Sequence, residues 1–377
     1  MRLPIFYGML IFLLLGCSRK QQDNNEDSVE LQIPLQYAKG FAVYKGEGYY
    51  RVDIRNSKDT LDIIETYYLV TDSLKYKRST DRFEISIPVK EIASISTTHI
   101  GFLAAFDKQS QLAGITGSRW VHDEEVKAGL ESGSVTDIGA DGLVDHERLI
   151  GIQPDVLLAY ESGLDAEGQA DQIRRFGIPV VLINEYLEDH PLGMAEWGKL
   201  FALLMNNPES GELWFNELSK EYQAINEQVK DIEIQPSVMT GLPFRGEWTI
   251  SGGKSFAATF LDDAGANYLW KDDERVGNYP VSIEEVLQRA TDANIWVNPG
   301  AAGNIQRILE TDSRLKTLEP IKSGMVFNNN KRVNEHGGND YWESAVAKPQ
   351  RVLKDLALIF HPNIFPNDTL YYYTQLK

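Results

Sequence analysis

The amino-acid sequence predicts an α/β protein with two Rossmann-like lobes joined by a single long α-helix, and with a small β-rich segment before the first lobe. The chain has 377 residues, and because one hydrophobic core stops growing at roughly 250 to 300 residues, two lobes are expected. Short apolar strands alternate with helical patterns, which is typical of parallel sheets covered by helices on both faces. One unusually long helical pattern separates the two sets of strands, so it can connect the lobes.

The N-terminus predicts an export signal and a lipid-modified cysteine. Arg2 precedes an apolar run over residues 3–15, which is shorter than the roughly 20 residues that a membrane-spanning helix requires. The run ends at Cys17 in a Leu-Leu-Gly-Cys sequence that resembles the bacterial lipobox, and Cys17 is the only cysteine. Because no second thiol is available for a disulfide, lipid attachment is its simplest use. We therefore predict a signal peptide at residues 1–16; the alternative is a chance cysteine in an uncleaved anchor.

A polar stretch and then a β-rich segment follow the cysteine. Residues 17–36 are polar and acidic, which predicts a solvated tether between the membrane and the fold. Residues 41–54 alternate apolar and polar side chains around a Lys-Gly-Glu-Gly turn, which predicts a β-hairpin. Further strands of this β-rich segment, which covers residues 37–90, are expected at 67–70 and 83–87.

Parallel βα units are predicted from Glu91 onward. The sequence there changes to short apolar runs separated by helical patterns, as in a sheet with helices on both faces. The N-terminal lobe, including the β-rich segment, is therefore expected over residues 37–207. Its parallel strands are expected at 92–96, 112–116, 155–160 and 178–183.

A long helix is predicted after this lobe. The pattern over residues 209–232 keeps apolar side chains three or four positions apart, so they form one buried face. At a rise of 1.5 Å per residue the helix would span about 36 Å, the diameter of a small domain. We predict that it connects the lobes within residues 208–234; the alternative is an ordinary amphipathic helix inside one large domain. The apolar positions are Leu218, Tyr222, Ile225, Val229 and Ile232.

A second set of βα units is predicted over residues 235–377. Pro236 prevents the long helix from continuing, and apolar runs and helical patterns then alternate again. A closing helix is expected at residues 349–360. The other elements are strands at 238–241, 295–297 and 325–328, and helices near 255–266 and 284–290.

Two short segments of similar sequence occur at a fixed offset, one in each predicted lobe. In each, a good N-cap residue, Asp145 or Ser282, precedes a short helix that runs into a strand. Glu147 and Glu284 both fall two residues after the cap, where the helix dipole favours a carboxylate and the side chain points to solvent. Glu285 forms a capping box with Ser282 and leaves Glu284 unused. The alternative for either glutamate is an ordinary surface acid that is favoured only by the helix dipole.

These segments and others resemble the family of ABC-importer substrate-binding proteins that bind iron-siderophores and cobalamin. The resemblance runs from about Glu91 to Phe360, and its pieces occur in the order of the family. Each piece is weak alone, but the ordered set is specific. The matching pieces are residues 92–99, 112–116, 146–160, 177–180, 251–255, 264–266 and 279–284.

The resemblance implies a function as well as a fold. Members of the family have two α/β lobes joined by one rigid helix, and one acidic residue in each lobe docks onto arginines of the permease. Glu147 and Glu284 occupy those positions. The chain is thus expected to be an exported lipoprotein, held at the membrane by its lipid, that carries an iron-siderophore, haem or cobalamin-type ligand to an ABC permease. No intrinsic cofactor is expected.

Candidate ligand contacts follow the predicted strands, because ligands bind at the carboxyl ends of parallel strands. Aromatic rings would contact a large, flat ligand, while arginines would meet its carboxylate, catecholate or hydroxamate oxygens. Tyr160 and Tyr279 also match places where the family's cobalamin binder carries aromatic residues. For Trp120 and Trp248, the alternative is a place in the hydrophobic core. The predicted ligand-binding residues are Arg119, Trp120, Tyr160, Arg245, Trp248 and Tyr279.

A polar, glycine-rich stretch after the last predicted strand is a lower-ranked candidate for the wall of the cleft. Its position beyond a strand end is again what suggests contact with a ligand. The residues concerned are Arg332, His336, Asp340, Tyr341 and Trp342.

The composition and the missing motifs argue against several other functions. A formal net charge of −18 disfavours nucleic-acid binding. The sequence has no Gly-x-Ser-x-Gly, Walker loop or dinucleotide fingerprint, so no catalytic residue is predicted. None of the six histidines lies at ligand spacing from another, so no metal site is predicted. A bare zinc or manganese binding protein and an exported lipoprotein hydrolase stay open as alternatives.

Overall fold

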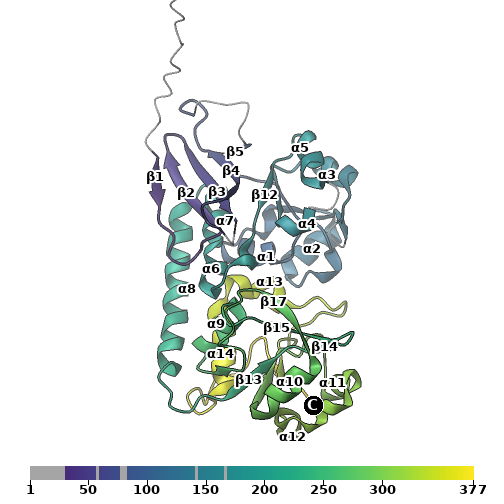
Figure 1. Cartoon of the computed structure of the whole chain (residues 1–377). Coiled ribbons are helices and arrows are strands. Elements are labelled where there is room, and N and C mark those ends of the chain that lie inside the picture. Colours follow the sequence, from purple (N-terminus) through teal and green to yellow (C-terminus); the bar gives the residue numbers. More distant parts are fainter. Residues whose placement is uncertain (1–29, 57–58, 77–82, 141–142, 165–167) are drawn as a thin grey trace, which may run out of the picture.

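The computed structural model describes residues 30–56, 59–76, 83–140, 143–164 and 168–377. Figure 1 shows one lobe above the other, with the long helix α8 along one side of both. The predicted signal peptide, Cys17 and residues 17–29 of the predicted tether lie outside the described residues. Within the described ranges, no helix is both long and apolar enough to cross a membrane.

A five-stranded sheet forms the β-rich segment, in the order β1-β2-β3-β4-β5. The predicted hairpin is confirmed, because β2 and β3 pair in antiparallel register on either side of a turn at Gly48, whose φ is +79°. All neighbouring strands are antiparallel except β4 and β5, which run parallel. The strands are β1 Leu31–Ile33, β2 Phe41–Gly46, β3 Tyr49–Arg55, β4 Ile63–Val70 and β5 Phe83–Ser86.

The end of the predicted tether belongs to this sheet. Strand β1 pairs with β2, and Ile33 and Leu35 pack against the core of the N-terminal lobe. The backbone N–H of Gln36 also donates to the Glu196 carboxylate. The prediction that residues 30–36 are a solvated tether was therefore wrong, because their apolar side chains find a partner that lies far along the chain.

The sheet of the N-terminal lobe is parallel, in the order β12-β11-β6-β7-β8. The strands Ile92–Ser94, Val156–Ala159 and Val180–Leu182 are buried along their whole length, as expected for a sheet covered by helices on both faces. The predicted alternation is confirmed. The elements are β6 Ile92–Ser94, α1 Thr98–Ala105, β7 Leu112–Ile115, α2 Glu124–Ser132, β8 Thr136–Asp137, β9 Gly139–Ala140, β10 Leu143–Val144, α3 His146–Ile152, β11 Val156–Ala159, α4 Glu161–Leu164, α5 Gln169–Arg175, β12 Val180–Leu182, α6 Pro191–Glu196 and α7 Gly198–Leu204.

The C-terminal lobe contains a second sheet, in the order β16-β13-β18-β19-β20, which is parallel except for β20. A separate antiparallel sheet, β14-β15-β17, lies beside it. The predicted closing helix is present as α14. The elements are β13 Ser237–Thr240, β14 Pro243–Phe244, β15 Glu247–Ser251, α9 Phe256–Asp263, β16 Asn267–Tyr268, β17 Asn278–Ser282, α10 Ile283–Arg289, β18 Ile295–Val297, α11 Ile305–Thr311, α12 Glu319–Ser323, β19 Val326–Asn328, α13 Asp340–Ser344, α14 Pro349–Phe360 and β20 Thr374–Gln375.

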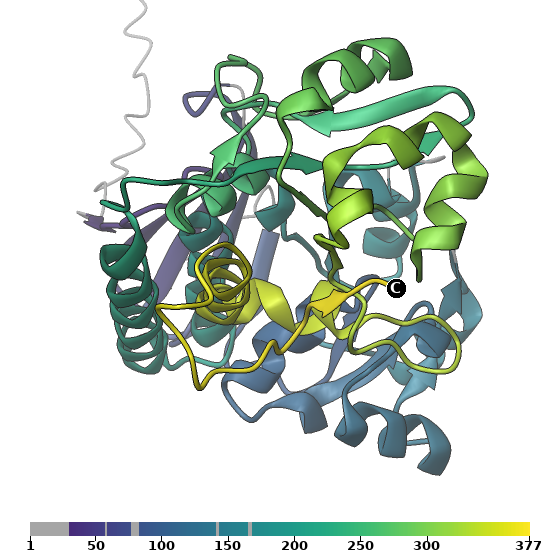
Figure 2. The ribbon, with the colours of Figure 1, turned by 90° about the horizontal axis from the view of Figure 1, so that it is seen from below.

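The long helix α8, Pro208–Val229, runs along both lobes. Asn207 caps it by accepting a hydrogen bond from the Ser210 N–H at 3.3 Å. One face is buried, and it packs against α7 of the N-terminal lobe and α14 of the C-terminal lobe. Figure 2 shows α14 beside α8 from below. The helix predicted from the apolar stripe is therefore present, and it ends before Ile232.

A second connection between the lobes was not predicted. After β19 the chain forms what we name the crossover segment, residues 329–348, in which α13 packs against α1 and Val346 joins the N-terminal core. The chain then returns as α14 to the C-terminal core. The contact is close, because a Cβ atom at Gly101 would overlap the carbonyl oxygen of Glu343. The lobes are thus held together by α8 and by this segment.

Candidate functional site

A cavity of about 820 Å³ lies where the lobes meet. The C-terminal lobe and the crossover segment supply most of its walls. The N-terminal lobe contributes Thr97 and Trp120. The other lining residues are Thr240, Gly241, Thr249, Ser251, Phe256, Ala257, Phe260, Leu261, Asn278, Asn298, Gly300, Ala301, Asn328, Asn329, Asn330, Val333, Gly337, Gly338, Asn339, Tyr341, Trp342, Leu356 and Tyr373.

The carboxyl ends of three neighbouring parallel strands form one wall of the cavity. Thr240 ends β13, Asn298 follows β18 and Asn328 ends β19, so the three side chains meet at one edge of the sheet. Asn298 has a φ of +55°, a left-handed conformation that asparagine tolerates better than most residues. The Asn328 amide donates to the carbonyls of Gly300 at 2.9 Å and Ala302 at 2.8 Å, which fixes the loop after β18.

Strand β15 divides its side chains between the cavity and the core. Thr249 and Ser251 line the cavity, while Trp248 and Ile250 point to the opposite face, because successive strand residues alternate in direction. Trp248 is 0% exposed, stacks on Trp296 with ring centroids 5.5 Å apart, and donates from Nε1 to the Thr240 carbonyl at 2.9 Å. The prediction that Trp248 lies in the pocket was wrong. It is a core residue that supports the cavity wall from behind.

Tyr279 also lies on the core face of this small sheet. In the register of β15 and β17, Tyr279 pairs with Ile250, whereas its neighbour Asn278 pairs with Ser251 and lines the cavity. The Tyr279 hydroxyl donates to Asp273 at 2.8 Å, and the Arg275 guanidinium lies 3.0 Å from the centre of its ring. The structure therefore places Tyr279 outside the lining.

Arg245 and Tyr160 do not line the cavity either. Arg245 sits in the turn between β14 and β15 with a φ of +53°, exposed, and its guanidinium lies 5.0 Å from the Phe244 ring. Tyr160 follows β11 and makes an edge contact with Tyr186 at 6.0 Å between ring centroids. A position directly after a strand was not sufficient to bring either side chain to the cavity.

Trp120 is the residue of the predicted set that the structure places in the lining. Its side chain is 38% exposed, and the Arg119 guanidinium lies 4.4 Å from the centre of its ring. Arg119 itself is exposed and lies outside the lining. From the lower-ranked set, Tyr341 and Trp342 line the cavity, and Trp342 is 61% exposed. Two tryptophans from different parts of the chain therefore offer open ring surface to this space.

The two helices that follow the repeated segments begin as predicted. Asp145 caps α3 by accepting from the N–H groups of Glu147 and Arg148, both at 3.1 Å, and Ser282 caps α10 by accepting from the Glu285 N–H at 3.1 Å. Glu147 and Glu284 are exposed. Figure 1 shows α3 in the upper lobe and α10 in the lower lobe, both away from α8.

The surroundings of these two glutamates differ. Arg314 donates to Glu284 at 2.9 Å, and this hydrogen bond holds the pKa of the Glu284 carboxyl below its ordinary value. Glu147 forms no ion pair with any residue in the described part of the chain. The N-terminal carboxylate is therefore open to a new partner, whereas the C-terminal one would share or exchange Arg314.

Comparisons with known proteins agree with this arrangement. The periplasmic binding protein family matches residues 92–332 of the sequence. The chain belongs to the periplasmic binding protein family. An uncharacterized lipoprotein of Methanocaldococcus jannaschii is 26% identical over 295 residues, which are 76% of this chain and 68% of that protein. The family resemblance expected from the sequence motifs is confirmed.

Solved structures of other periplasmic binding proteins have the same two-lobe fold. A possible iron-binding (periplasmic solute-binding) protein from Staphylococcus epidermidis has a TM-score of 0.57 and 16% identity, covering 72% of this chain and 98% of that one. A periplasmic haem binding protein from Pseudomonas aeruginosa has a TM-score of 0.57 and 14% identity, covering 73% of this chain and 93% of that one. At this level of identity the likeness establishes the fold.

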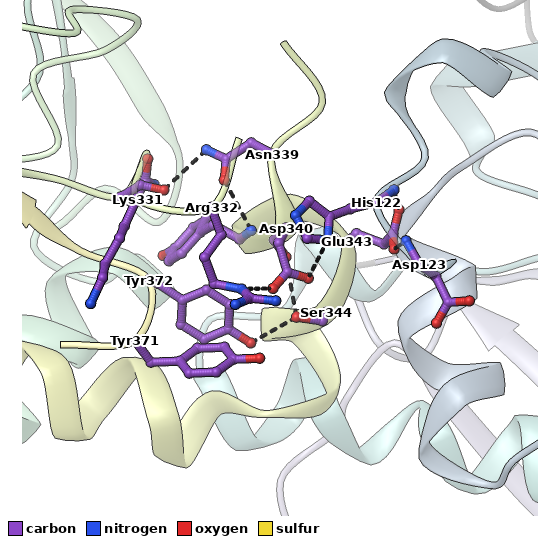
Figure 3. A network of polar contacts seen from close by, with 12 residues as sticks. His122, Asp123, Lys331, Arg332, Asn339, Asp340, Glu343, Ser344, Tyr371 and Tyr372 are labelled. Atoms are coloured by element: carbon purple, nitrogen blue, oxygen red, sulfur yellow. Dashed lines mark hydrogen bonds and ion pairs between the residues drawn. The ribbon is translucent and has the colours of Figure 1, made fainter. Parts of the chain in front are cut away.

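The crossover segment of this binding protein is fastened to the loop before α2 by a buried carboxylate. Figure 3 shows Glu343 reaching His122 and Asp123, whose backbone N–H groups donate to it at 2.7 and 2.6 Å. Glu343 is 3% exposed, and burial raises the pKa of its carboxyl to about 7. The Asn334 amide adds hydrogen bonds to the carbonyls of Arg119 at 3.2 Å and Val121 at 3.0 Å. Trp120 is thus held in place by groups from the other side of the cavity.

The charged residues of the lower-ranked set serve this segment and do not line the cavity. Arg332 donates to Asp340 at 2.5 Å, which ties the chain before the loop to the start of α13 (Figure 3). His336 is exposed, with Nε2 3.4 Å from Glu335. Residue 338 requires a glycine, because a Cβ atom there would overlap the Trp120 carbonyl oxygen.

The binding protein has no cluster of three or more His, Cys, Asp or Glu side chains placed to hold a metal ion among its described residues. His99 is fully buried, with Nδ1 2.7 Å from the Ser94 hydroxyl, and burial lowers its pKa to about 3. A neutral, hydrogen-bonded histidine of this kind is a structural residue of the N-terminal lobe.

The asparagines of the cavity are the residues that the sequence analysis missed. Residues 328–330 are three consecutive asparagines directly after the apolar run of β19, and all three line the cavity. The rule that ligands bind at strand ends applied to them as well. The predicted site named aromatic and charged residues at strand ends and did not include neutral amides.

Proposed function

We propose that the chain is the substrate-binding lipoprotein of an ABC importer, and that it captures an iron-siderophore, haem or cobalamin-type ligand in the cavity between its lobes. The observation that carries this proposal is the cavity of about 820 Å³, lined by strand ends of one lobe and faced by Trp120 of the other. Pockets for organic ligands have volumes of roughly 300–1,000 Å³. A bare metal ion needs far less space and charged or imidazole ligands, so the size favours an organic chelate.

Two further facts support this cargo. Trp120 and Trp342 offer exposed ring surface to the cavity, and such surface suits a large ligand with flat or apolar faces. Among the structures with this fold are proteins described as haem-binding and as a possible iron-binding protein. The proposed capture involves modest closure, because α8 and the crossover segment both resist large movements between the lobes.

Glu147 and Glu284 are proposed as the contacts with the permease. Both are exposed carboxylates in the first turn of a short helix, one in each lobe. Two such charges on separate lobes would orient the binding protein on complementary arginines and raise the association rate. Spreading of the lobes by the permease would then release the ligand.

The proposed anchor is a lipid on Cys17, with the folded part of the chain exported to the periplasm or cell exterior. The support is the lipobox-like sequence at Cys17 and the lipoprotein of Methanocaldococcus jannaschii to which the chain is similar.

Removing the two docking charges tests the proposal. The variant Glu147→Gln with Glu284→Gln should keep the dissociation constant of the ligand within about twofold, because neither residue lines the cavity, and should lose importer-dependent uptake. Ligand affinity is measured by calorimetry and uptake with labelled ligand in cells.

The matched control is Glu125→Gln with Glu285→Gln. These are also exposed acids in the first turns of helices, and Glu285 is adjacent to Glu284. The control should transport normally. Normal uptake by the Glu147 and Glu284 variant would exclude the docking assignment. Loss of ligand binding would show that these residues act in ligand binding and not at the permease.

A further inference from the structure

Among the residues that the structure describes, the lining of the cavity contains no carboxylate, ammonium, guanidinium or imidazole group. None of its lining residues is Asp, Glu, Lys, Arg or His. This is unexpected in a chain with 55 acidic and 37 basic residues. The polar groups that it presents are neutral amides and hydroxyls, which both donate and accept hydrogen bonds. The polar lining residues are Thr97, Thr240, Thr249, Ser251, Asn278, Asn298, Asn328, Asn329, Asn330, Asn339, Tyr341 and Tyr373. The Tyr373 hydroxyl and the Oδ1 atoms of Asn298 and Asn330 are themselves buried.

Two arginines near lining residues in the sequence, Arg332 and Arg275, have acidic partners, whereas the guanidinium of a third, Arg119, lies 4.4 Å from the centre of the Trp120 ring. Arg332, two residues after Asn330, is 2.5 Å from Asp340. Arg275, three residues before Asn278, is 2.6 Å from Asp273. A ligand carboxylate would have to compete with these carboxylates for either guanidinium. The two arginines expected to meet anionic oxygens, Arg119 and Arg245, lie outside the lining, and their guanidinium groups contact the rings of Trp120 and Phe244.

The N-termini of three helices, α1, α9 and α13, lie at the cavity and give it a positive field of limited size, since the N-cap residues Thr97 and Asn339 also line it. Phe256 and Ala257 begin α9 and line the cavity. The Ser255 hydroxyl already accepts from the Ala258 N–H at 3.2 Å, so one of the free donors of this helix end is used. A helix N-terminus is equivalent to roughly half an elementary charge. Asp340 and Glu343 in the first turn of α13 oppose the field of that helix end, so the helix ends together do not neutralise a ligand with two or three negative charges, and the net charge of −18 opposes its approach.

Several of the neutral side chains have polar capacity left for a ligand. Asn328 and Asn339 are occupied, because their amides bond the backbone at both ends. Asn278, by contrast, is exposed and uses its Oδ1 to accept from the Ser251 hydroxyl, which leaves the amide N–H groups as donors. Thr249 is exposed on the same face of the sheet. These groups suit ligand amides, hydroxyls and ether oxygens.

We infer that the cavity takes an uncharged ligand rich in amide or hydroxyl groups, such as an electroneutral metal chelate or corrinoid, and discriminates against carboxylate-bearing or polyanionic chelates. This inference rests on the proposed function, since it names the charge class of the ligand captured at that same site. The physical reason is that burying an anion without a matching cation costs more than burying neutral polar groups that find hydrogen bonds.

A panel of ligands of known charge tests the inference on the full chain purified in detergent. Calorimetric titration would use cyanocobalamin and the ferric trihydroxamate ferrichrome as uncharged ligands, and haemin and ferric enterobactin as anionic ones. We expect one uncharged ligand to bind at least about 100-fold more tightly than either anion. Its dissociation constant should change less than about threefold between low and high salt, because no ion pair is screened. Tighter binding of an anion would overturn the inference and leave the capture function standing, whereas binding of none would overturn both.

Charge-sensing variants at Thr249 give a second test with the ligand that binds. Gln, Glu and Lys are substituted at this exposed cavity position, with Thr249→Gln as the neutral reference. At an effective dielectric constant near 20, a charge within several Å of a ligand charge changes the dissociation constant by about tenfold or more. We expect the Thr249→Glu and Thr249→Lys variants to differ from each other by less than about threefold.

The control position is Glu247, which lies on the same strand and face as Thr249 but outside the lining. Glu247→Gln and Glu247→Lys should leave the dissociation constant unchanged. If Thr249→Lys strengthens and Thr249→Glu weakens binding by tenfold or more, while the Glu247 variants have no effect, the ligand is anionic and the inference fails.

Discussion

The two lobes share one architecture but contribute very differently to the cavity. Both place the carboxyl ends of a parallel sheet toward the junction between the lobes, yet of the described residues of the N-terminal lobe only Thr97 and Trp120 reach the lining. In the N-terminal lobe, polar groups near the strand ends bond to each other. The Ser94 hydroxyl contacts His99 at 2.7 Å, and Asn184 accepts from the Glu161 N–H at 3.0 Å. In the C-terminal lobe, the strand ends carry Thr240, Asn298 and Asn328, which line the cavity although Asn328 also bonds to the backbone of the loop after β18.

This difference predicts different roles for the two lobes in ligand binding. The C-terminal lobe, with its extra β14-β15-β17 sheet and the asparagine-rich turns, has the groups that can distinguish one ligand from another. The N-terminal lobe presents a single large ring, held in position by the crossover segment. Substitutions in the first set should change which ligand binds, and substitutions of the ring should weaken every ligand alike.

The largest effect is expected where a tryptophan supports the C-terminal wall from the core. Trp248→Ala removes a fully buried ring and leaves the Thr240 carbonyl without its donor, so it should lower the free energy of unfolding by about 3–5 kcal/mol. Urea denaturation followed by circular dichroism measures this change.

Trp342→Ala is the matched control, because its ring is largely exposed in the cavity. It should change the free energy of unfolding by less than about 1 kcal/mol while weakening the ligand by about tenfold or more. Equal losses of stability in the two variants would contradict the assignment of one tryptophan to the core and the other to the cavity.

A smaller effect, which depends on pH, is expected at the contact between the crossover segment and the N-terminal lobe. Burial, together with the carboxylates of Asp123 and Asp340, raises the pKa of Glu343 from an ordinary value of 4.5 to about 7 in the folded protein. Between these values the folded state binds more protons than the unfolded state. Glu343 therefore lowers the free energy of unfolding as the pH rises from about 4.5 to about 7.

Glu343→Gln removes this titration. The free energy of unfolding of the wild type should fall between pH 5 and pH 8, whereas that of the variant should not, because a neutral amide does not ionise. The difference between the two should therefore change by up to about 3 kcal/mol in favour of the variant. Urea denaturation at both pH values measures the difference. Glu335→Gln, an exposed acid of the same segment, should show no such trend. A difference between Glu343→Gln and the wild type that is independent of pH would rule out the raised pKa.

The smallest effect is expected at Tyr279, on the core face of β17. Tyr279→Phe removes a partly buried hydrogen bond to Asp273, which also keeps its contacts with Arg275, so the free energy of unfolding should fall by about 1 kcal/mol. Ligand affinity should stay within about twofold, because the ring lies outside the lining. A loss of affinity of tenfold or more would restore the original prediction that Tyr279 contacts the ligand.

The fold could be predicted much better than the site. The strands around Val156 and Val181 and the stripe on α8 have patterns that depend only on local periodicity, and these elements formed close to the predicted positions. For the cavity, the alternation of Trp248 and Ile250 with Thr249 and Ser251 contained a usable signal, since it separates a core face from an open face. The asparagines at 328–330 were equally visible in the sequence.

By itself, the sequence determined the α/β class, the long helix, the two capped helices that expose Glu147 and Glu284, and the family, because these follow from periodicity, capping and ordered motifs. Only the tertiary structure decided which strand-end side chains meet, and that the crossover segment carries Glu343 across to the N–H groups of His122 and Asp123. The physical reason is that the cavity forms between segments that are far apart in the sequence and do not pack against each other. Its lining and its lack of charge depend on how whole lobes approach each other, and no local pattern records that distance.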